Sequence, residues 1–176
     1  MISLARFWFT SLWQPKKLLK AIEKPNYLMA LLNLLIPPLL VSIVGIFVLS
    51  GGIGSVDVSA YAKTIVVSVV KYAAVLLMFG IGAVSAGKGS LKRMVCFASF
   101  PVTGYLLLVD SALIIGNPVA GIPISIVLKS LLIAFAISMA GIAHAEAKMK
   151  WWKAGVWIAV VIAVTDYFTP YLASLI

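Results

Sequence analysis

The chain alternates between long apolar stretches and short polar segments. Each apolar stretch is about as long as the roughly 20 residues that a helix needs to cross a bilayer. Prolines at 37–38 and at 101 fall inside two of the stretches, where we expect kinks because proline removes a backbone hydrogen bond. The pattern predicts five membrane-spanning helices, over residues 28–49, 63–86, 94–115, 122–143 and 154–174.

Composition places the chain among membrane proteins. Hydrophobic residues make up 63% of its 176 residues and charged residues 11%, with a mean hydropathy of +1.14. Soluble domains are about half apolar and about a quarter charged. The length accommodates the spans and short loops but no separate soluble domain. We therefore expect an all-α polytopic membrane protein with one transmembrane domain at 26–176.

Residues 1–25 are predicted to form an interfacial amphipathic segment ahead of that domain. Aromatic residues crowd its first half, and Pro15 suits the first turn of a helix. Leu18, Leu19 and Ile22 would share one face of this helix while lysines occupy the other. Such a helix lies on the bilayer surface with its lysines toward anionic headgroups. The alternative is a frayed terminus with a few membrane anchors.

Basic residues determine the predicted orientation. The net charge is +9, and most cations flank the apolar stretches, which favours lipid headgroups over nucleic acid as their partners. Segments 87–93 and 144–153 are basic, so both are expected in the cytoplasm, with the amino terminus inside and the carboxyl terminus outside. The side chains expected to contact anionic headgroups are Arg6, Lys16, Lys17, Lys20, Lys24, Lys88, Lys92, Arg93, Lys148, Lys150 and Lys153.

Ionisable residues also occur within the predicted spans. Such charges cost at least about 2.5–3.5 kcal/mol each, so they normally face the interior of a bundle and pair. All four lie at a similar depth, roughly 9–14 Å from the outer ends of their helices, and their charges cancel. We predict one ionic cluster, with structural pairing favoured over a polar ligand or ion pathway and over independent snorkelling. Its members are Lys71, Asp110, Lys129 and Asp166.

No catalytic, cofactor or metal site is predicted. The only histidine, His144, is expected in a cytoplasmic loop, where it cannot meet Asp110 or Asp166 in a serine hydrolase triad. No group of histidine, cysteine and acidic residues has metal-ligand spacing. Cys96 is the only cysteine, so no intrachain disulfide can form. We therefore expect a protein that is not an enzyme and has no cofactor.

Three short motifs stand out along the chain. They are an aromatic Pro-Lys entry segment, a glycine and basic loop before an early proline, and a loop before the last span: Trp13-Gln14-Pro15-Lys16-Lys17, Gly87-Lys88-Gly89-Ser90-Leu91-Lys92-Arg93 with Phe97-Ala98-Ser99-Phe100-Pro101, and Gly141-Ile142-Ala143-His144 with Lys153-Ala154. With these motifs the chain resembles the Yip1-domain family of five-helix membrane proteins. In that family, eukaryotic members are associated with vesicle traffic and small GTPases, and prokaryotic members have no settled activity. The short leader of this chain resembles the prokaryotic type.

These observations lead to one functional hypothesis and two rivals. The leading hypothesis is a non-enzymatic integral membrane protein that organises membrane or protein partners through its basic cytoplasmic face. Its expected partners are anionic lipids and a membrane protein or a second copy of the chain. The rivals are a small-solute or ion permease that uses the ionic cluster, and an accessory subunit of a larger membrane complex.

Overall fold

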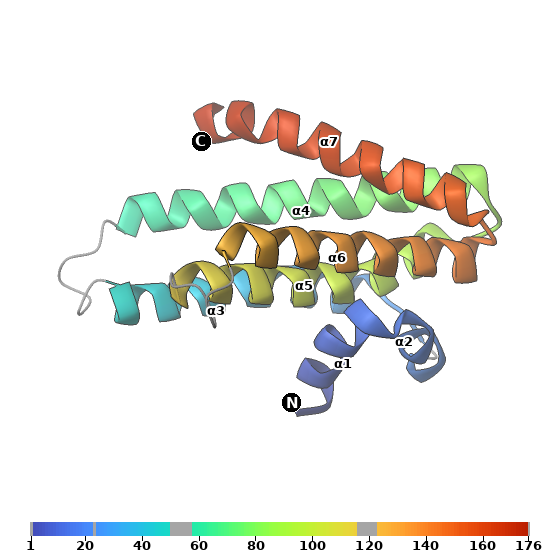
Figure 1. The fold of residues 1–176 in the computed structure, drawn as a ribbon, viewed down its shortest axis with the longest axis horizontal. Helices are drawn as coiled ribbons and strands as arrows, with labels where there is room; N and C mark the ends of the chain where they lie inside the picture. Colours follow the sequence, from blue (N-terminus) through green and yellow to red (C-terminus); the bar gives the residue numbers. More distant parts are fainter. Residues whose placement is uncertain (1, 23, 50–57, 116–122, 176) are drawn as a thin grey trace.

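The protein folds into helices that run along one another. The computed structural model describes residues 2–22, 24–49, 58–115 and 123–175, and within these ranges it contains helices and no strand. The all-α prediction is therefore confirmed for this part of the chain. In chain order the helices are α1 (Ile2–Trp13), α2 (Pro15–Ala21), α3 (Tyr27–Leu49), α4 (Val58–Ala86), α5 (Leu91–Ile115), α6 (Ile124–Ala147) and α7 (Trp151–Leu175), as Figure 1 shows.

Four of these helices are long and apolar enough to cross a membrane. Helix α3 has 23 residues, but its described apolar part, Tyr27–Pro37, is shorter than a span. The structure thus supports a membrane protein with four candidate spans in its described part, one fewer than the sequence predicts. The four windows are Ile65–Ala86, Leu91–Val109, Ile124–Ala147 and Trp151–Tyr171.

The helices extend beyond the predicted apolar boundaries. Helix α4 begins at Val58, inside the segment predicted as a loop, and α5 begins at Leu91, so the basic pair that follows is helical. At the start of α5 the Met94 N–H donates to the Ser90 carbonyl at 3.0 Å. The differences arise because hydropathy locates the hydrocarbon boundary, whereas backbone hydrogen bonds determine where a helix ends.

Helix α5 lies at the centre of the bundle. Of its candidate span, 67% of the residues are buried, against 22% for the spans in α4 and α7. Helix α5 contacts α1, α3, α4 and α6, and α7 packs against α4 and α6 on the opposite side from α1. The α5 side chains Phe97 and Phe100 are fully buried in this core. The helix carries Pro101 without interruption.

The N-terminal segment differs from the predicted single surface helix, because it forms two helices that contribute to the core. Helix α2 begins at Pro15, and its Leu18 side chain is buried. In α1, Trp8 and Leu12 are buried, and the Phe7 ring meets Phe100 edge to face at 6.5 Å. The leader is therefore held against α5 and α6 over part of its length.

A chain of buried hydrogen bonds joins α1 to the spans. The Trp8 Nε1–H donates to Asn33 Oδ1 at 3.0 Å, and Asn33 Nδ2 donates to Ser99 Oγ at 2.9 Å. The Asn33 carbonyl accepts from Thr103 Oγ1 at 2.6 Å. Asn33 and Thr103 are both fully buried. Because an unpaired buried amide is costly, these bonds determine where α1 and α3 lie against α5.

Close backbone approach fixes the position of α1 as well. A Cβ atom added at Gly104 would overlap the carbonyl oxygen of Trp8, whereas one added at Gly155 would meet nothing within 4 Å. Ser138 Oγ donates to the Ser11 carbonyl at 2.6 Å on the α6 side. Helix α1 can thus lie against α5 only because residue 104 is a glycine and has no Cβ atom.

We expect Gly104→Ala to destabilise the protein by about 1–3 kcal/mol, because backbone atoms of α1 cannot move aside as a flexible side chain would. The free energy of unfolding in detergent micelles measures the effect. Gly155→Ala is the matched control and should leave stability unchanged or slightly raised, since alanine favours a helix over glycine. Equal effects of the two substitutions would contradict the docking of α1 on α5.

Candidate functional site

Two basic turns meet at one end of the bundle. The Lys88 N–H, in the turn between α4 and α5, donates to the Ala147 carbonyl at the end of α6 at 2.7 Å. A Cβ atom at Gly87 would overlap that same carbonyl oxygen. The turn before α3 lies at this end too, as Figure 1 shows. We call this region, formed by residues 87–93 and 144–153, the basic end.

An ion pair fastens the two turns together. Arg93 Nε and Nη2 donate to the two carboxylate oxygens of Glu146 at 2.7 and 3.1 Å. The Arg93 guanidinium also lies 5.2 Å from the centre of the Phe97 ring. Two parallel bonds give such a pair a defined geometry. Glu146 was not among the site residues predicted from the sequence. The one signal for its pairing is that it is an acidic residue within the basic segment 144–153.

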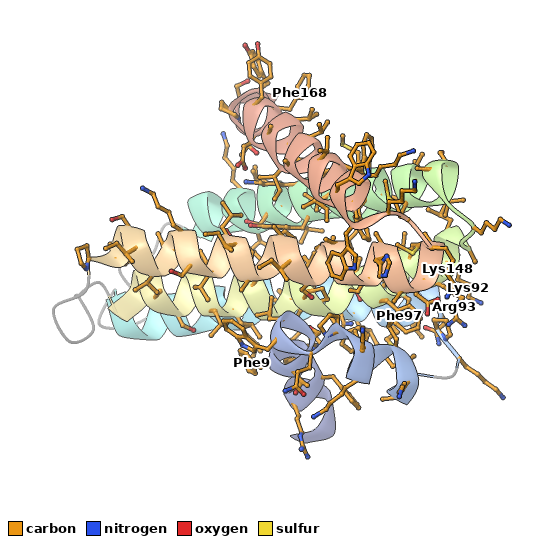
Figure 2. The ribbon with its side chains drawn as sticks, turned by 45° about the vertical axis from the view of Figure 1, so that its right-hand side comes forward. Phe9, Lys92, Arg93, Phe97, Lys148 and Phe168 are labelled. Carbon is orange, nitrogen blue, oxygen red and sulfur yellow. The ribbon has the colours of Figure 1, made fainter. Side chains whose placement is uncertain are left out.

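The other cations predicted to contact headgroups remain accessible. Their side chains are exposed, and that of Arg93 is partly buried by its pair. Figure 2 shows Lys92, Arg93 and Lys148 gathered at the basic end. The exposed side chains are Arg6, Lys16, Lys17, Lys20 and Lys24 in the leader, Lys88 and Lys92 in the first turn, and Lys148, Lys150 and Lys153 in the second.

In the second turn the prediction for His144 is wrong, and the backbone of Lys148 has an unusual conformation. His144 lies in α6 rather than in a loop. Its Nδ1 is 2.8 Å from the Met149 carbonyl oxygen, and its ring stacks on Trp151 with 5.0 Å between centroids.

Lys148 ends α6 with a φ of 57°, in the left-handed region that favours glycine. A lysine there costs about 1–2 kcal/mol relative to an ordinary conformation.

The second candidate site is an ion pair within the spans. Lys71 Nζ in α4 lies 2.7 Å from Asp166 Oδ1 in α7. The Lys71 side chain is 23% exposed and that of Asp166 60% exposed. The structure therefore brings together one cation and one anion of the four residues predicted to cluster, and it places them at the surface of the bundle.

The other two members of the predicted cluster are not joined to this pair by any described contact. Lys129 is exposed on α6. The side chain of Asp110 lies outside the described part of the structure, although its backbone belongs to α5. A single cluster of four charges thus stays a prediction.

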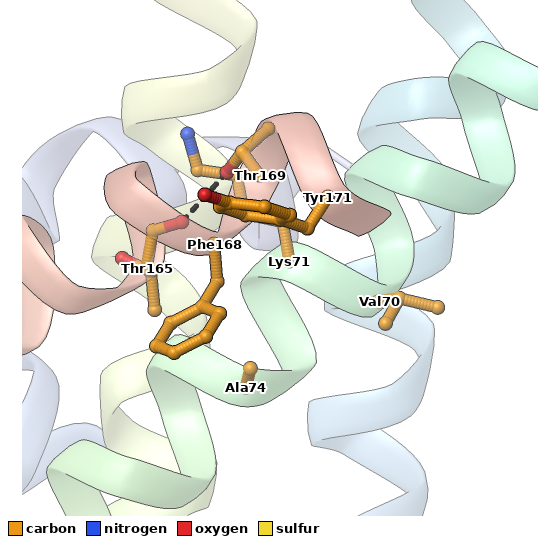
Figure 3. Close-up of a pocket in the computed structure, with 7 residues that line it drawn as sticks. All are labelled: Val70, Lys71, Ala74, Thr165, Phe168, Thr169 and Tyr171. Carbon is orange, nitrogen blue, oxygen red and sulfur yellow. Dashed lines mark hydrogen bonds between the residues drawn. The ribbon is translucent and has the colours of Figure 1, made fainter. Parts of the chain in front are cut away.

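A small pocket adjoins the ion pair. Its volume is about 260 Å³, below the roughly 300–1,000 Å³ that is usual for small-molecule sites. Figure 3 shows Lys71 reaching from α4 across a lining that is otherwise mainly aromatic, aliphatic and threonine side chains of α4 and α7. The described geometry offers one cation and no convergent set of polar groups to a solute.

Comparison with known proteins identifies no relative of this chain. No family model matches the chain, and neither a curated protein nor a solved structure matches it. The resemblance to the Yip1-domain family therefore stays a prediction from the motifs. The function has to be argued from the geometry.

We expect a double-mutant cycle of Lys71→Ala and Asp166→Ala to be non-additive by about 0.5–2 kcal/mol in unfolding free energy, because each single change leaves its partner charge unpaired. The matched control combines Asp166→Ala with Lys63→Ala. Lys63 is exposed on α4, about 12 Å along the helix from Lys71. Strict additivity in the first cycle, or equal coupling in both, would contradict the pairing.

We expect Lys148→Gly to raise the free energy of unfolding by about 1 kcal/mol, because glycine adopts the left-handed conformation without strain. Chemical denaturation in micelles measures the change. Lys150→Gly, two residues along in the same turn, is the control and should give no such gain. A loss of stability in Lys148→Gly would mean that the lysine side chain itself stabilises the turn.

Proposed function

We propose that this protein is a non-enzymatic integral membrane protein that organises anionic lipids and membrane or protein partners through its basic end. The observation that carries the proposal is the fixed juxtaposition of two turns whose cations stay exposed. The Arg93–Glu146 pair and the Lys88 N–H bond to Ala147 hold the turns together without covering those cations. A lysine kept at the strained position 148 supports a role for its charge.

The proposal includes five spans, with the basic end in the cytoplasm. Helix α3 has 23 residues, which is long enough to span the membrane. Counting it with the four candidate spans gives five crossings, and an odd number of crossings puts the two termini on opposite sides of the membrane. The positive-inside rule then puts the amino terminus inside and the carboxyl terminus outside. The two ends of α7 support this orientation, because α7 starts in the basic end and finishes at the opposite end of the bundle, as Figure 1 shows.

A second candidate function is an accessory subunit of a larger membrane assembly, including one made of copies of this chain. The Lys71–Asp166 pair favours it, because Asp166 is 60% exposed on a helix proposed to cross the bilayer. Charged groups that face hydrocarbon are costly, and a packed partner would cover them. The permease hypothesis receives less support, since the pair lies beside a surface pocket of about 260 Å³.

We expect the reconstituted protein to enrich phosphatidylglycerol over phosphatidylcholine in its lipid annulus, and Lys88→Gln with Lys150→Gln to lower this enrichment. Each cation near an anionic surface contributes about 1 kcal/mol, so removing two should lower the enrichment by up to about thirtyfold. Lipid analysis of polymer-extracted particles measures it. High salt should abolish the enrichment, because it screens exposed charges.

The matched control neutralises two exposed cations that lie away from the basic end. Lys63→Gln with Lys129→Gln removes the same charge near the start of α4 and of α6. The proposal expects wild-type enrichment in this variant. An equal loss in both variants would show that net charge alone attracts the lipid, and no enrichment in the wild type would refute the lipid-organising role.

A further inference from the structure

Helices α1 and α2 enclose a groove that the basic end does not include. Its volume is about 870 Å³. The two helices meet at a sharp turn at Gln14, as the N-terminal helices in Figure 1 show. The lining side chains that define its chemistry are Arg6, Phe9, Thr10, Trp13, Gln14 and Lys17.

The polar part of this groove suits a phosphate group. Arg6 on α1 and Lys17 on α2 both line it, and the lining residues that the structure describes include no acidic side chain. A guanidinium presents several donors in a fixed plane and an ammonium adds a point charge, which together are the usual protein partners of phosphate oxygens. Thr10 and Gln14 add neutral polar groups to the same lining. The groove therefore favours a monoanionic or dianionic phosphate over a neutral headgroup.

The aromatic side chains that line the groove would have no apolar partner if the ligand were a free phosphate. Phe9 is 40% exposed and Trp13 66% exposed, and both contribute to the lining. Tryptophan is enriched where headgroups meet acyl chains, because its ring is apolar and its N–H is polar. A ligand with a phosphate and an acyl chain satisfies both the cations and the aromatic rings of the lining. A phospholipid has this chemistry, whereas inorganic phosphate leaves the rings unused.

The walls of the groove are anchored to the spans. On the α1 side, Trp8 binds Asn33 and the Ser11 carbonyl accepts from Ser138. On the α2 side, Leu18 is 1% exposed and therefore packed into the core. Such anchoring lowers the conformational cost of binding, because the two cations already stand on fixed helices.

We propose that the groove between α1 and α2 binds one anionic phospholipid, with its phosphate between Arg6 and Lys17 and an acyl chain along Phe9 and Trp13. This site deepens the proposed function and rests on it, because it needs the leader to face the same leaflet as the basic end. It adds a specific, saturable lipid to the diffuse attraction of the exposed lysines.

The test is a titration of the full-length protein in neutral detergent with phosphatidylglycerol, followed by native mass spectrometry. We expect one molecule to bind with saturation and phosphatidylcholine to bind much more weakly. Arg6→Gln with Lys17→Gln should weaken binding about thirtyfold, from about 1 kcal/mol per cation. The matched control, Lys63→Gln with Lys129→Gln, removes the same charge from exposed lysines that do not line the groove and are not among the side chains predicted to contact headgroups. It should retain near wild-type affinity.

Several results would overturn the site. Equal weakening in both double variants would mean diffuse attraction. Equal affinity for phosphatidylcholine, whose phosphate carries the same charge beside a choline cation, would mean that the groove does not select a headgroup of net negative charge. Displacement of the lipid by millimolar inorganic phosphate would identify free phosphate as the ligand. None of these results touches the Lys88 and Lys150 experiment, so a failure of the site can be told apart from a failure of the proposed function.

A second measurement covers the case in which the groove variant fails to fold. Phosphatidylglycerol with a photoreactive acyl chain, incubated with the wild-type protein, should label the peptide that contains Phe9 and Trp13. Excess unlabelled phosphatidylglycerol should remove the label, and excess phosphatidylcholine should not. Labelling confined to α3–α7 would refute the site without any variant.

Discussion

A bilayer offers no hydrogen-bond partners, and the arrangement of this protein follows from that constraint. Several hydroxyl side chains bond to a carbonyl of their own helix, and a few other polar side chains find partners on other helices. Asn33 binds Trp8 and Ser99, and Lys71 binds Asp166. Each contact joins segments far apart in the chain, so pairing a polar side chain of one helix also selects which helices pack together. Helix α1 is the clearest case, because its docking depends on Asn33 and on the open space at Gly104.

At the basic end, polar groups also need partners, but water can supply them, so most of the charged side chains there stay exposed. Outside the hydrocarbon, water satisfies charges, and most lysines there have exposed side chains. Arg93 is the exception, since its bidentate pair with Glu146 ties the start of α5 to the end of α6. The pair leaves the neighbouring lysines on a rigid support, and the proposed function uses that support to hold them toward anionic headgroups. The groove between α1 and α2 extends this chemistry to the leader, with Arg6 and Lys17 on anchored walls.

Hydropathy was sufficient to predict the long helices, because a helix pairs all its own backbone groups and needs only apolar length. It misplaced helix ends at Val58, Leu91 and Ala147, since polar residues can continue a helix beyond the hydrocarbon. The matched depth of Lys71 and Asp166 anticipated opposite charges at one level, but which anion meets which cation depends on α4 lying beside α7. The bond between Trp8 and Asn33 left no local signal, because propensity and periodicity describe neighbours in sequence and not contacts across the fold.

The basic end is proposed to face the cytoplasm, and cysteine accessibility tests this orientation most directly. Ser90, in the first basic turn, and Ser174, near the end of α7, are both exposed, while the native Cys96 is fully buried. A membrane-impermeant maleimide should label Ser174→Cys in intact cells and should label Ser90→Cys only after the membrane is opened. Labelling of Ser90→Cys in intact cells, with Ser174→Cys protected, would place the basic end outside and contradict the account.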